Sequence, residues 1–335
     1  MLLFSSVAPF LLLRVSRYEF RVLSRNSQPV TCINIMTNQT KGILYTLITV
    51  LMWGVLAIAL KVASKVIDSP TIVWFRFSLA FSGMAIWAIF NDPKSLKILY
   101  KPSWLLVIST LALAWNYIGF MLGVQYTTPG NAQVAVQTGP VVLAILGVVF
   151  FKEKLSLMQG FGFFLALVGF WIFYQQHVQA LSGQTGEYTK GMLLTVSAAL
   201  TWAVYAAMQK KLILQHPVTT LNLFIFGLPI LLYFPFANFE SLAHLSLGYW
   251  LLLIFLGANT LISYVCLSLA LKYMEAGKVS VLLILNPIIT FVIMGVLTWM
   301  QVSWIAPEHF SVLSVLGALI ALGGAMLVVW KKNRS

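Results

Sequence analysis

The stretch LGVQYTTPGNAQVAVQTGP, from Leu122 to Pro140, returns in altered form as LALKYMEAGKVSVLLILNP, from Leu269 to Pro287. The two copies align at a constant separation of 147 residues without a gap, and each leads into a second apolar run. Proline inside a helix removes a backbone donor and clashes with the preceding turn. The chain therefore contains one proline-interrupted apolar helix twice, and we expect the rest to be arranged as two copies around this pair.

The composition places the chain in a lipid bilayer. Of 335 residues, 60% are hydrophobic and 9% are charged, whereas a soluble domain carries roughly a quarter charged residues. The net charge of +13 comes from basic residues in short turns between apolar segments. This distribution favours contact with the cytoplasmic leaflet and argues against nucleic acid as a partner.

Apolar segments of about 20 residues, the length that crosses a bilayer, follow one another along the chain. Because each half would hold five of them, the second half would enter the membrane from the opposite side. We therefore predict an all-α membrane protein with ten transmembrane helices, built as two inverted five-helix repeats. The expected spans are 43–61, 71–90, 103–123, 129–151, 155–174, 190–209, 218–236, 248–271, 278–300 and 310–330.

The positive charges predict the orientation of these spans. With the N-terminus in the cytoplasm, 17 basic residues fall on the inner side and only Lys61, Lys65 and Lys190 on the outer side, which leaves Arg76 within a span. Cytoplasmic loops are enriched in lysine and arginine. We therefore expect a multi-pass protein of the cell membrane with both termini in the cytoplasm.

The first 41 residues fit neither repeat. They read either as a basic arm lying on the inner membrane surface or as a non-native upstream extension with Met36 as the true start. After them we expect a first repeat over 42–175, an extracytoplasmic linker over 176–189 and a second repeat over 190–332.

Several motifs carry a family resemblance. They are Trp53-Gly54, the run Val73–Phe77 with Arg76 inside it, Gly139-Pro140 and the charged turn at Glu153. With these motifs the chain resembles the drug/metabolite transporter superfamily, specifically paired EamA domains. The resemblance implies transport of small metabolites, often amino acids or drugs and frequently outward. The second half has Leu223 and Met300 where the first has Arg76 and Glu153, so any role carried over for those two residues is asymmetric.

Candidate substrate-contacting residues gather around the two breaks. Paired breaks at corresponding positions point to a binding site near the bilayer midplane, and polar residues within spans should face the protein interior. The same side chains could instead only kink helices or join them by hydrogen bonds. The candidates are Pro140, Pro287, Gln133, Gln137, Asn116, Tyr117, Tyr264, Asn286, Arg76, Trp53 and Trp202.

Arg76 and the acidic residues bear on mechanism. Arg76 could extend outward to the membrane surface or bind a substrate carboxylate. No carboxylate or histidine falls near the middle of a span, which disfavours proton coupling through such groups. We expect no metal and no cofactor, and the motifs of ATP-driven pumps and of intramembrane hydrolases are missing.

These observations favour a secondary transporter rather than an enzyme. We expect it to move a small organic metabolite, an amino acid or related compound, by alternating access and in the export direction. The alternative is a non-transporting membrane sensor or scaffold, which needs no site. The sequence does not decide the substrate, the direction, the coupling or the oligomeric state, a homodimer included.

Overall fold

The computed structural model describes residues 37–152, 156–180, 186–307 and 311–329. Within these ranges every regular element is a helix, and all of them belong to one compact unit, residues 36–335. The helical class predicted from composition is confirmed for these residues. The two readings of the N-terminal segment, and Glu153, lie outside the described residues.

The described residues of the first half form six α-helices and one short 3-10 helix. Side-chain caps fix several of their starts: Thr37, Asp68, Ser103 and Thr128 each accept a hydrogen bond from the backbone N–H three residues further on. Such a cap satisfies a donor that the first helical turn leaves free. The elements are α2 (Asn38–Ala63), α3 (Ser69–Asn91), η1 (Pro93–Leu99), α4 (Trp104–Tyr126), α5 (Pro129–Ala135), α6 (Thr138–Phe151) and α7 (Leu157–Ala180).

The second half repeats this order, except that two short elements follow its second span where the first half has one. The elements are α8 (Glu187–Leu212), α9 (Val218–Tyr233), η2 (Phe234–Phe236), α10 (Phe239–Ala243), α11 (Leu247–Tyr273), α12 (Ala276–Leu283), α13 (Asn286–Trp299) and α14 (Val312–Val329). The pairs α5–α6 and α12–α13 are the interrupted helices that the repeated stretch predicts.

Eight of the ten expected spans coincide with helical segments that are long and apolar enough to cross a membrane. In three of them two consecutive elements form one segment: α5 with α6, α12 with α13, and α9 with η2. The other two expected spans fall on α7 and α14, helices of 24 and 18 residues. That these two also cross the bilayer stays a prediction.

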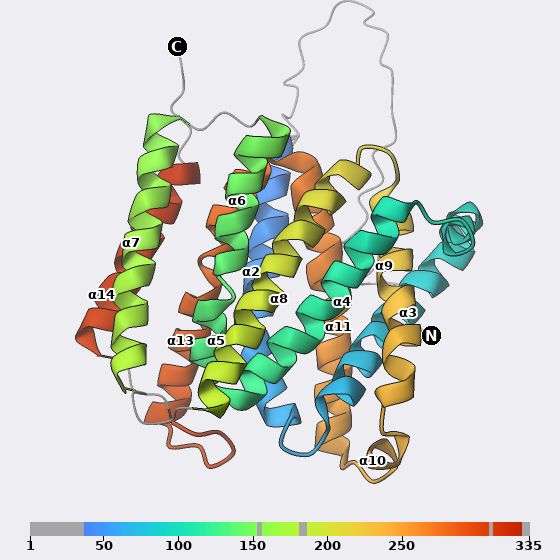
Figure 1. The fold of residues 1–335 in the computed structure, drawn as a ribbon. Helices are drawn as coiled ribbons and strands as arrows, with labels where there is room; N and C mark the ends of the chain where they lie inside the picture. Colours follow the sequence, from blue (N-terminus) through green and yellow to red (C-terminus); the bar gives the residue numbers. More distant parts are fainter. Residues whose placement is uncertain (1–36, 153–155, 181–185, 308–310, 330–335) are drawn as a thin grey trace, which may run out of the picture. The chain divides into compact units, whose positions relative to one another are not determined.

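The two halves exchange partners in the bundle (Figure 1). The third span of each half packs along the first span of the other, α4 on α8 and α11 on α2. The interrupted helices follow the same pattern, with α6 against α8 and α12 against α2. The helices α3 and α9 pack together, and so do α7 and α14. The first and fourth spans of both halves therefore surround the centre of the bundle.

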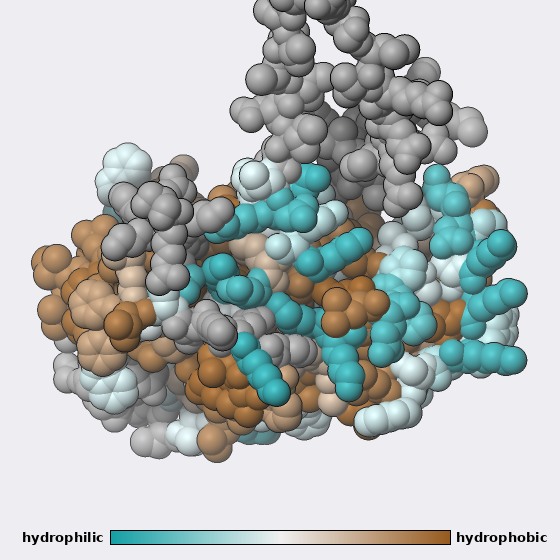
Figure 2. Space-filling view, turned by 90° about the horizontal axis from the view of Figure 1, so that it is seen from above, coloured by the Kyte–Doolittle hydropathy of each residue, from teal (hydrophilic) through white to brown (hydrophobic). Residues whose placement is uncertain are grey.

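The first helices of the two halves run in opposite directions. Gly42, near the start of α2, lies against Met274, and Lys210, near the end of α8, donates a hydrogen bond to the Met274 carbonyl at 3.1 Å. At the other end of the bundle, Lys61 of α2 and Gly191 of α8 both lie against Thr127. The end at which α2 begins, seen from above in Figure 2, carries many hydrophilic residues.

The outer faces of the helices are apolar. Large hydrophobic side chains such as Leu51, Ile86, Leu111 and Val149 are exposed on the surface of the bundle. In water such a surface would promote aggregation, but against lipid it is matched by the acyl chains. The described part of the chain is therefore a membrane-embedded bundle with an apolar exterior.

Candidate binding cavity at the paired helix breaks

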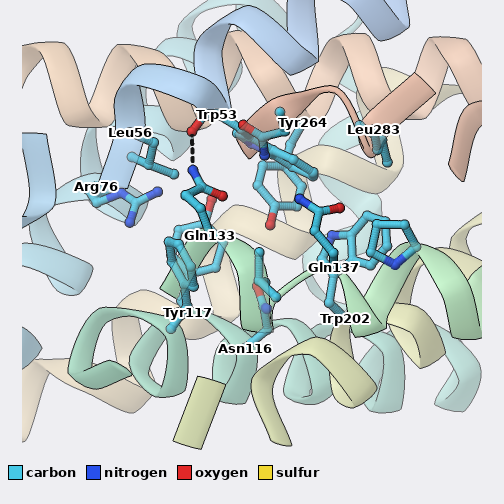
Figure 3. Close-up of a pocket in the computed structure, with 14 residues that line it drawn as sticks. Trp53, Leu56, Arg76, Asn116, Tyr117, Gln133, Gln137, Trp202, Tyr264 and Leu283 are labelled. Atoms are coloured by element: carbon cyan, nitrogen blue, oxygen red, sulfur yellow. Dashed lines mark hydrogen bonds between the residues drawn. The ribbon is translucent and has the colours of Figure 1, made fainter. Parts of the chain in front are cut away.

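A cavity lies beside both helix breaks (Figure 3), lined by the first four spans of the first half and by the first, third and fourth spans of the second half. The cavity volume is about 60 Å³, which is smaller than the roughly 300–1,000 Å³ of typical small-molecule sites. The 14 lining residues come from both halves: Trp53, Leu56, Arg76, Asn116, Tyr117, Phe120, Gln133, Val136, Gln137, Pro140, Trp202, Tyr264, Leu283 and Asn286.

The prolines explain where the two helices break. The ring of a proline clashes with the carbonyl four residues earlier, which is that of Val136 for Pro140 and of Leu283 for Pro287. The interruptions fall at or next to these positions, at Val136 and Gln137 in one half and at Ile284 and Leu285 in the other. Around both breaks, backbone N–H groups bond to carbonyls three residues back, as in a 3-10 turn. Each break thereby places a turn of non-α-helical backbone next to the cavity.

Aromatic side chains from matching positions of the two halves meet at the cavity. The rings of Trp53 and Trp202, 149 residues apart, lie 5.8 Å apart at 78°. The rings of Tyr117 and Tyr264, 147 residues apart, lie 5.5 Å apart. Trp53 also contacts Tyr264 at 5.5 Å. Edge-to-face and tilted contacts are the favoured geometries of aromatic pairs, so these four rings form a continuous apolar wall.

The amide side chains of the cavity are only partly satisfied. Gln133 donates from Nε2 to the Trp53 carbonyl at 2.7 Å (Figure 3), and Asn116 donates to a carbonyl of α8 at 2.9 Å. These two bonds join helices. The side-chain oxygens of Gln133, Gln137 and Asn286 are buried and have no hydrogen-bond partner in the described part of the chain. Buried amide groups without partners are unfavourable, so these oxygens are available to a bound molecule.

Arg76 is buried at the cavity, with 2% of its surface exposed. Its Nε donates to the Thr260 hydroxyl at 3.0 Å, and its guanidinium carbon lies 4.5 Å from the centre of the Tyr117 ring. Among residues 37–152, 156–180, 186–307 and 311–329, no carboxylate forms an ion pair with it. The structure therefore places this cation inside the bundle rather than at the outer rim.

Ten of the eleven residues predicted from the sequence line this one cavity. The exception is Pro287, which is buried at the start of α13 without lining the cavity. That these ten contact a substrate stays a prediction. Of the four lining residues that were missed, Val136 and Leu283 occupy matching positions 147 residues apart, each four before its proline. Val136 and Leu283 could therefore have been predicted from the repeat. Leu56 and Phe120 could not, because nothing in the sequence distinguishes them from the many other apolar residues of the spans.

Acidic groups stay away from the cavity. None of its lining residues is an aspartate, glutamate or histidine. Within the described ranges, no three histidine, cysteine, aspartate or glutamate residues lie close enough together to hold a metal ion. The lining thus offers one cation, several amides, aromatic rings and apolar side chains, a set suited to binding an organic molecule.

Comparison with known proteins defines the class. Residues 40–175 and 189–330 each match the EamA-like transporter family. The chain is 33% identical over 288 residues to the "Uncharacterized inner membrane transporter YhbE" of Escherichia coli K12, covering 85% of this chain and 90% of that protein. It is 30% identical to an "Uncharacterized transporter" of Haemophilus influenzae, covering 85% and 94%. The chain therefore belongs to the EamA-like transporter family, with two EamA-like domains.

A solved structure agrees with the fold. A protein crystal structure superposes with a TM-score of 0.65 at 16% sequence identity, covering 87% of this chain and 97% of the other. At that identity the likeness concerns the fold alone. Together, family membership and the apolar helices define a multi-pass membrane protein of transporter type.

Proposed function

We propose that this protein is a secondary transporter that moves a small organic metabolite, an amino acid or related compound, out of the cell across the cytoplasmic membrane by alternating access. The observation that carries the proposal is the cavity at the two helix breaks, to which both EamA-like domains contribute matching residues. Broken helices at corresponding positions of two repeats are typical of substrate sites in secondary transporters.

The same proposal includes ten spans, an inverted repeat and both termini in the cytoplasm. The opposite directions of α2 and α8 support the inverted arrangement. Lys61 contacts the same turn, at Thr127, that the start of α8 approaches, while Lys210 lies at the opposite end. This separation agrees with the charge distribution that led to the orientation. In such an arrangement the second half can open the cavity to one side of the membrane in the same way that the first half opens it to the other side.

The test is uptake of a labelled amino-acid panel by proteoliposomes that contain the purified protein. Wild type is compared with Gln137→Ala, which removes a buried amide from the cavity. Gln209→Ala is the matched control, because Gln209 is an equally buried glutamine that bonds to Ser268 at 3.0 Å away from the cavity. We expect saturable uptake that falls about tenfold or more in Gln137→Ala, the scale of one lost hydrogen-bonding group, and that is retained in Gln209→Ala.

Two other outcomes would change the proposal. Equal loss in both variants, with both proteins folded, would mean that Gln137 acts through packing and not through substrate. If the wild-type protein is folded and reconstituted yet moves no amino acid, amine, sugar or nucleotide derivative, transport itself is refuted. Binding of a partner protein by that inactive material would then favour a sensor or scaffold.

A further inference from the structure

Arg76 stands out as a buried cation to which the described part of the protein supplies no counter-ion. Its Nε donates to the Thr260 hydroxyl, and its guanidinium lies against the ring of Tyr117. Removing a charged group from water costs several kcal/mol unless a partner charge compensates, and within a membrane such residues usually pair or contact a substrate. No described carboxylate forms that pair.

The second half of the chain shows that the fold does not need an arginine here. The position 147 residues on is Leu223, which is fully buried in α9. The helices α3 and α9 pack against each other, so an arginine and a leucine occupy matching places in the same bundle. An arginine is costly to bury, and the second half packs with Leu223 in its place. Arg76 is therefore expected to have a role other than packing.

The guanidinium group of Arg76 indicates the chemistry of its ligand. Its Nε donates to Thr260, and no described carboxylate forms an ion pair with the group. A guanidinium binds carboxylate and phosphate through parallel N–H donors. The lining holds only this one cation, and a phosphate at neutral pH carries nearly two negative charges. The single positive charge of Arg76 therefore matches the single negative charge of one carboxylate.

The rest of the cavity fits the other end of such a molecule. In Figure 3, Gln137 and Trp202 lie on the side opposite Arg76, with Gln133 between them. Gln137 presents an unpartnered oxygen and Trp202 an unpartnered indole N–H. Because unpartnered polar atoms also occur elsewhere in the bundle, these two atoms do not by themselves indicate a ligand. They offer hydrogen bonds at the end of the cavity opposite Arg76.

We infer that Arg76 is the anion subsite of the cavity, and that the substrate carries one carboxylate, which this guanidinium binds, joined to an apolar or aromatic body held by the tryptophan and tyrosine rings. This inference rests on the proposed transport function and narrows it to monocarboxylates, zwitterions included. Neutral and purely cationic molecules are thereby poor substrates.

The experiment uses carboxylates paired with their primary amides, which keep the shape and lose the charge. The pairs are phenylalanine and phenylalaninamide, leucine and leucinamide, and 3-phenylpropionate and 3-phenylpropionamide. Binding to the purified full-length protein is measured as the ligand-induced rise in melting temperature and as Kd. In wild type we expect at least one carboxylate to bind at least tenfold more tightly than its amide, because only the carboxylate pairs with the cation.

Three variants separate binding from folding. Arg76→Leu copies the second half and should keep or raise the melting temperature of the ligand-free protein, while the preference for carboxylate over amide disappears. Arg76→Lys keeps the positive charge but loses the parallel N–H donors of the guanidinium, and it should weaken carboxylate binding about tenfold. Thr260→Val removes only the hydroxyl that orients the guanidinium and should weaken it several-fold, which keeps the test valid if Arg76→Leu fails to fold.

The outcomes distinguish this inference from the transport proposal. Amides that bind or move as well as carboxylates in wild type, or a carboxylate preference that survives Arg76→Leu, overturn the anion subsite and leave the transporter standing. If no carboxylate of the panel binds to wild type, the inference also fails. Absence of transport for every solute class refutes the proposed function independently of Arg76.

Discussion

Arg76 and Gln137 of the first half contribute polar groups to the cavity, whereas the corresponding positions of the second half hold Leu223 and Ile284. The tryptophan and tyrosine positions, in contrast, are the same in both halves. The shared residues build walls and packing, and the unshared ones supply most of the hydrogen-bonding chemistry. On the proposed function, the cavity would suit an unsymmetrical ligand whose polar end lies against the first half.

In both halves a lysine also forms hydrogen bonds to the turn that precedes the interrupted helix. Lys61 donates to backbone carbonyls at the end of α4, the closest being that of Thr127 at 2.6 Å. Its counterpart Lys210, 149 residues on, donates to the carbonyl of Met274 at 3.1 Å, and Met274 corresponds to Thr127 at the 147-residue offset. Each lysine holds the turn before the broken helix, at opposite ends of the bundle.

The largest effect is expected where the halves are most alike, at the α7–α14 contact. A Cβ on Gly169 would meet backbone atoms of Gly317 and Ala321, and one on Gly324 would meet backbone of Gly162 and Ala166. Backbone cannot move aside cheaply, and overpacking of this kind costs about 1–3 kcal/mol or more. Gly169→Ala and Gly324→Ala should therefore each lower the free energy of unfolding by a similar amount, measured by denaturation in mild detergent.

Gly160→Ala is the control for this prediction. Gly160 also lies in α7, but nothing lies within 4 Å of a Cβ built on it, so alanine should be neutral or slightly stabilising there. A variant at position 169 or 324 that is as stable as Gly160→Ala would show that the two halves do not share this tight contact.

An intermediate effect is expected from the two lysines. On the proposed alternating access, Lys61→Met and Lys210→Met each release the turn at one end, and a hydrogen bond to a charged group contributes about 1.5–3 kcal/mol. We expect the cavity to become at least about tenfold more reactive from the Lys61 side in one variant and from the Lys210 side in the other. The measurement is labelling of Phe120→Cys with membrane-impermeant thiol reagents, in protein whose two cysteines are replaced by alanine.

Lys65→Met controls for loss of a lysine at the same end as Lys61. Lys65 bonds to the carbonyl of Trp304 at 2.8 Å and not to the turn before α5, so its loss should leave labelling unchanged. If Lys61→Met and Lys210→Met raise reactivity from the same side, the two lysines are not counterparts in an alternating mechanism.

The sequence predicted the breaks because proline acts locally, and the repeat made each break visible twice. These two features, together with the polar and charged residues within the spans, led to ten of the cavity residues. The partners of Arg76 were not predictable, because Thr260 lies 184 residues away and only the packing of α3 against α11 brings them together. Leu56 and Phe120 were missed for a related reason: in a bundle that is apolar on both faces, hydrophobicity does not tell a cavity wall from a lipid contact.

The smallest effect is expected from the prolines, where the halves look the same in sequence but differ at the cavity. Pro140 lines the cavity and Pro287 does not. Alanine at either position restores the missing N–H and removes the ring clash, so each broken helix gains a hydrogen bond that it lacked. Because Gln137 belongs to the break before Pro140 and lines the cavity, Pro140→Ala should raise KM for uptake roughly two- to fivefold, an effect of up to about 1 kcal/mol. Pro287→Ala should change KM less than this and alter mainly the rate, since it changes the backbone beside Asn286 without removing a lining residue. Equal KM shifts in both variants would mean that the two breaks contribute alike to substrate binding, and that the specialisation of the first half resides in its side chains alone.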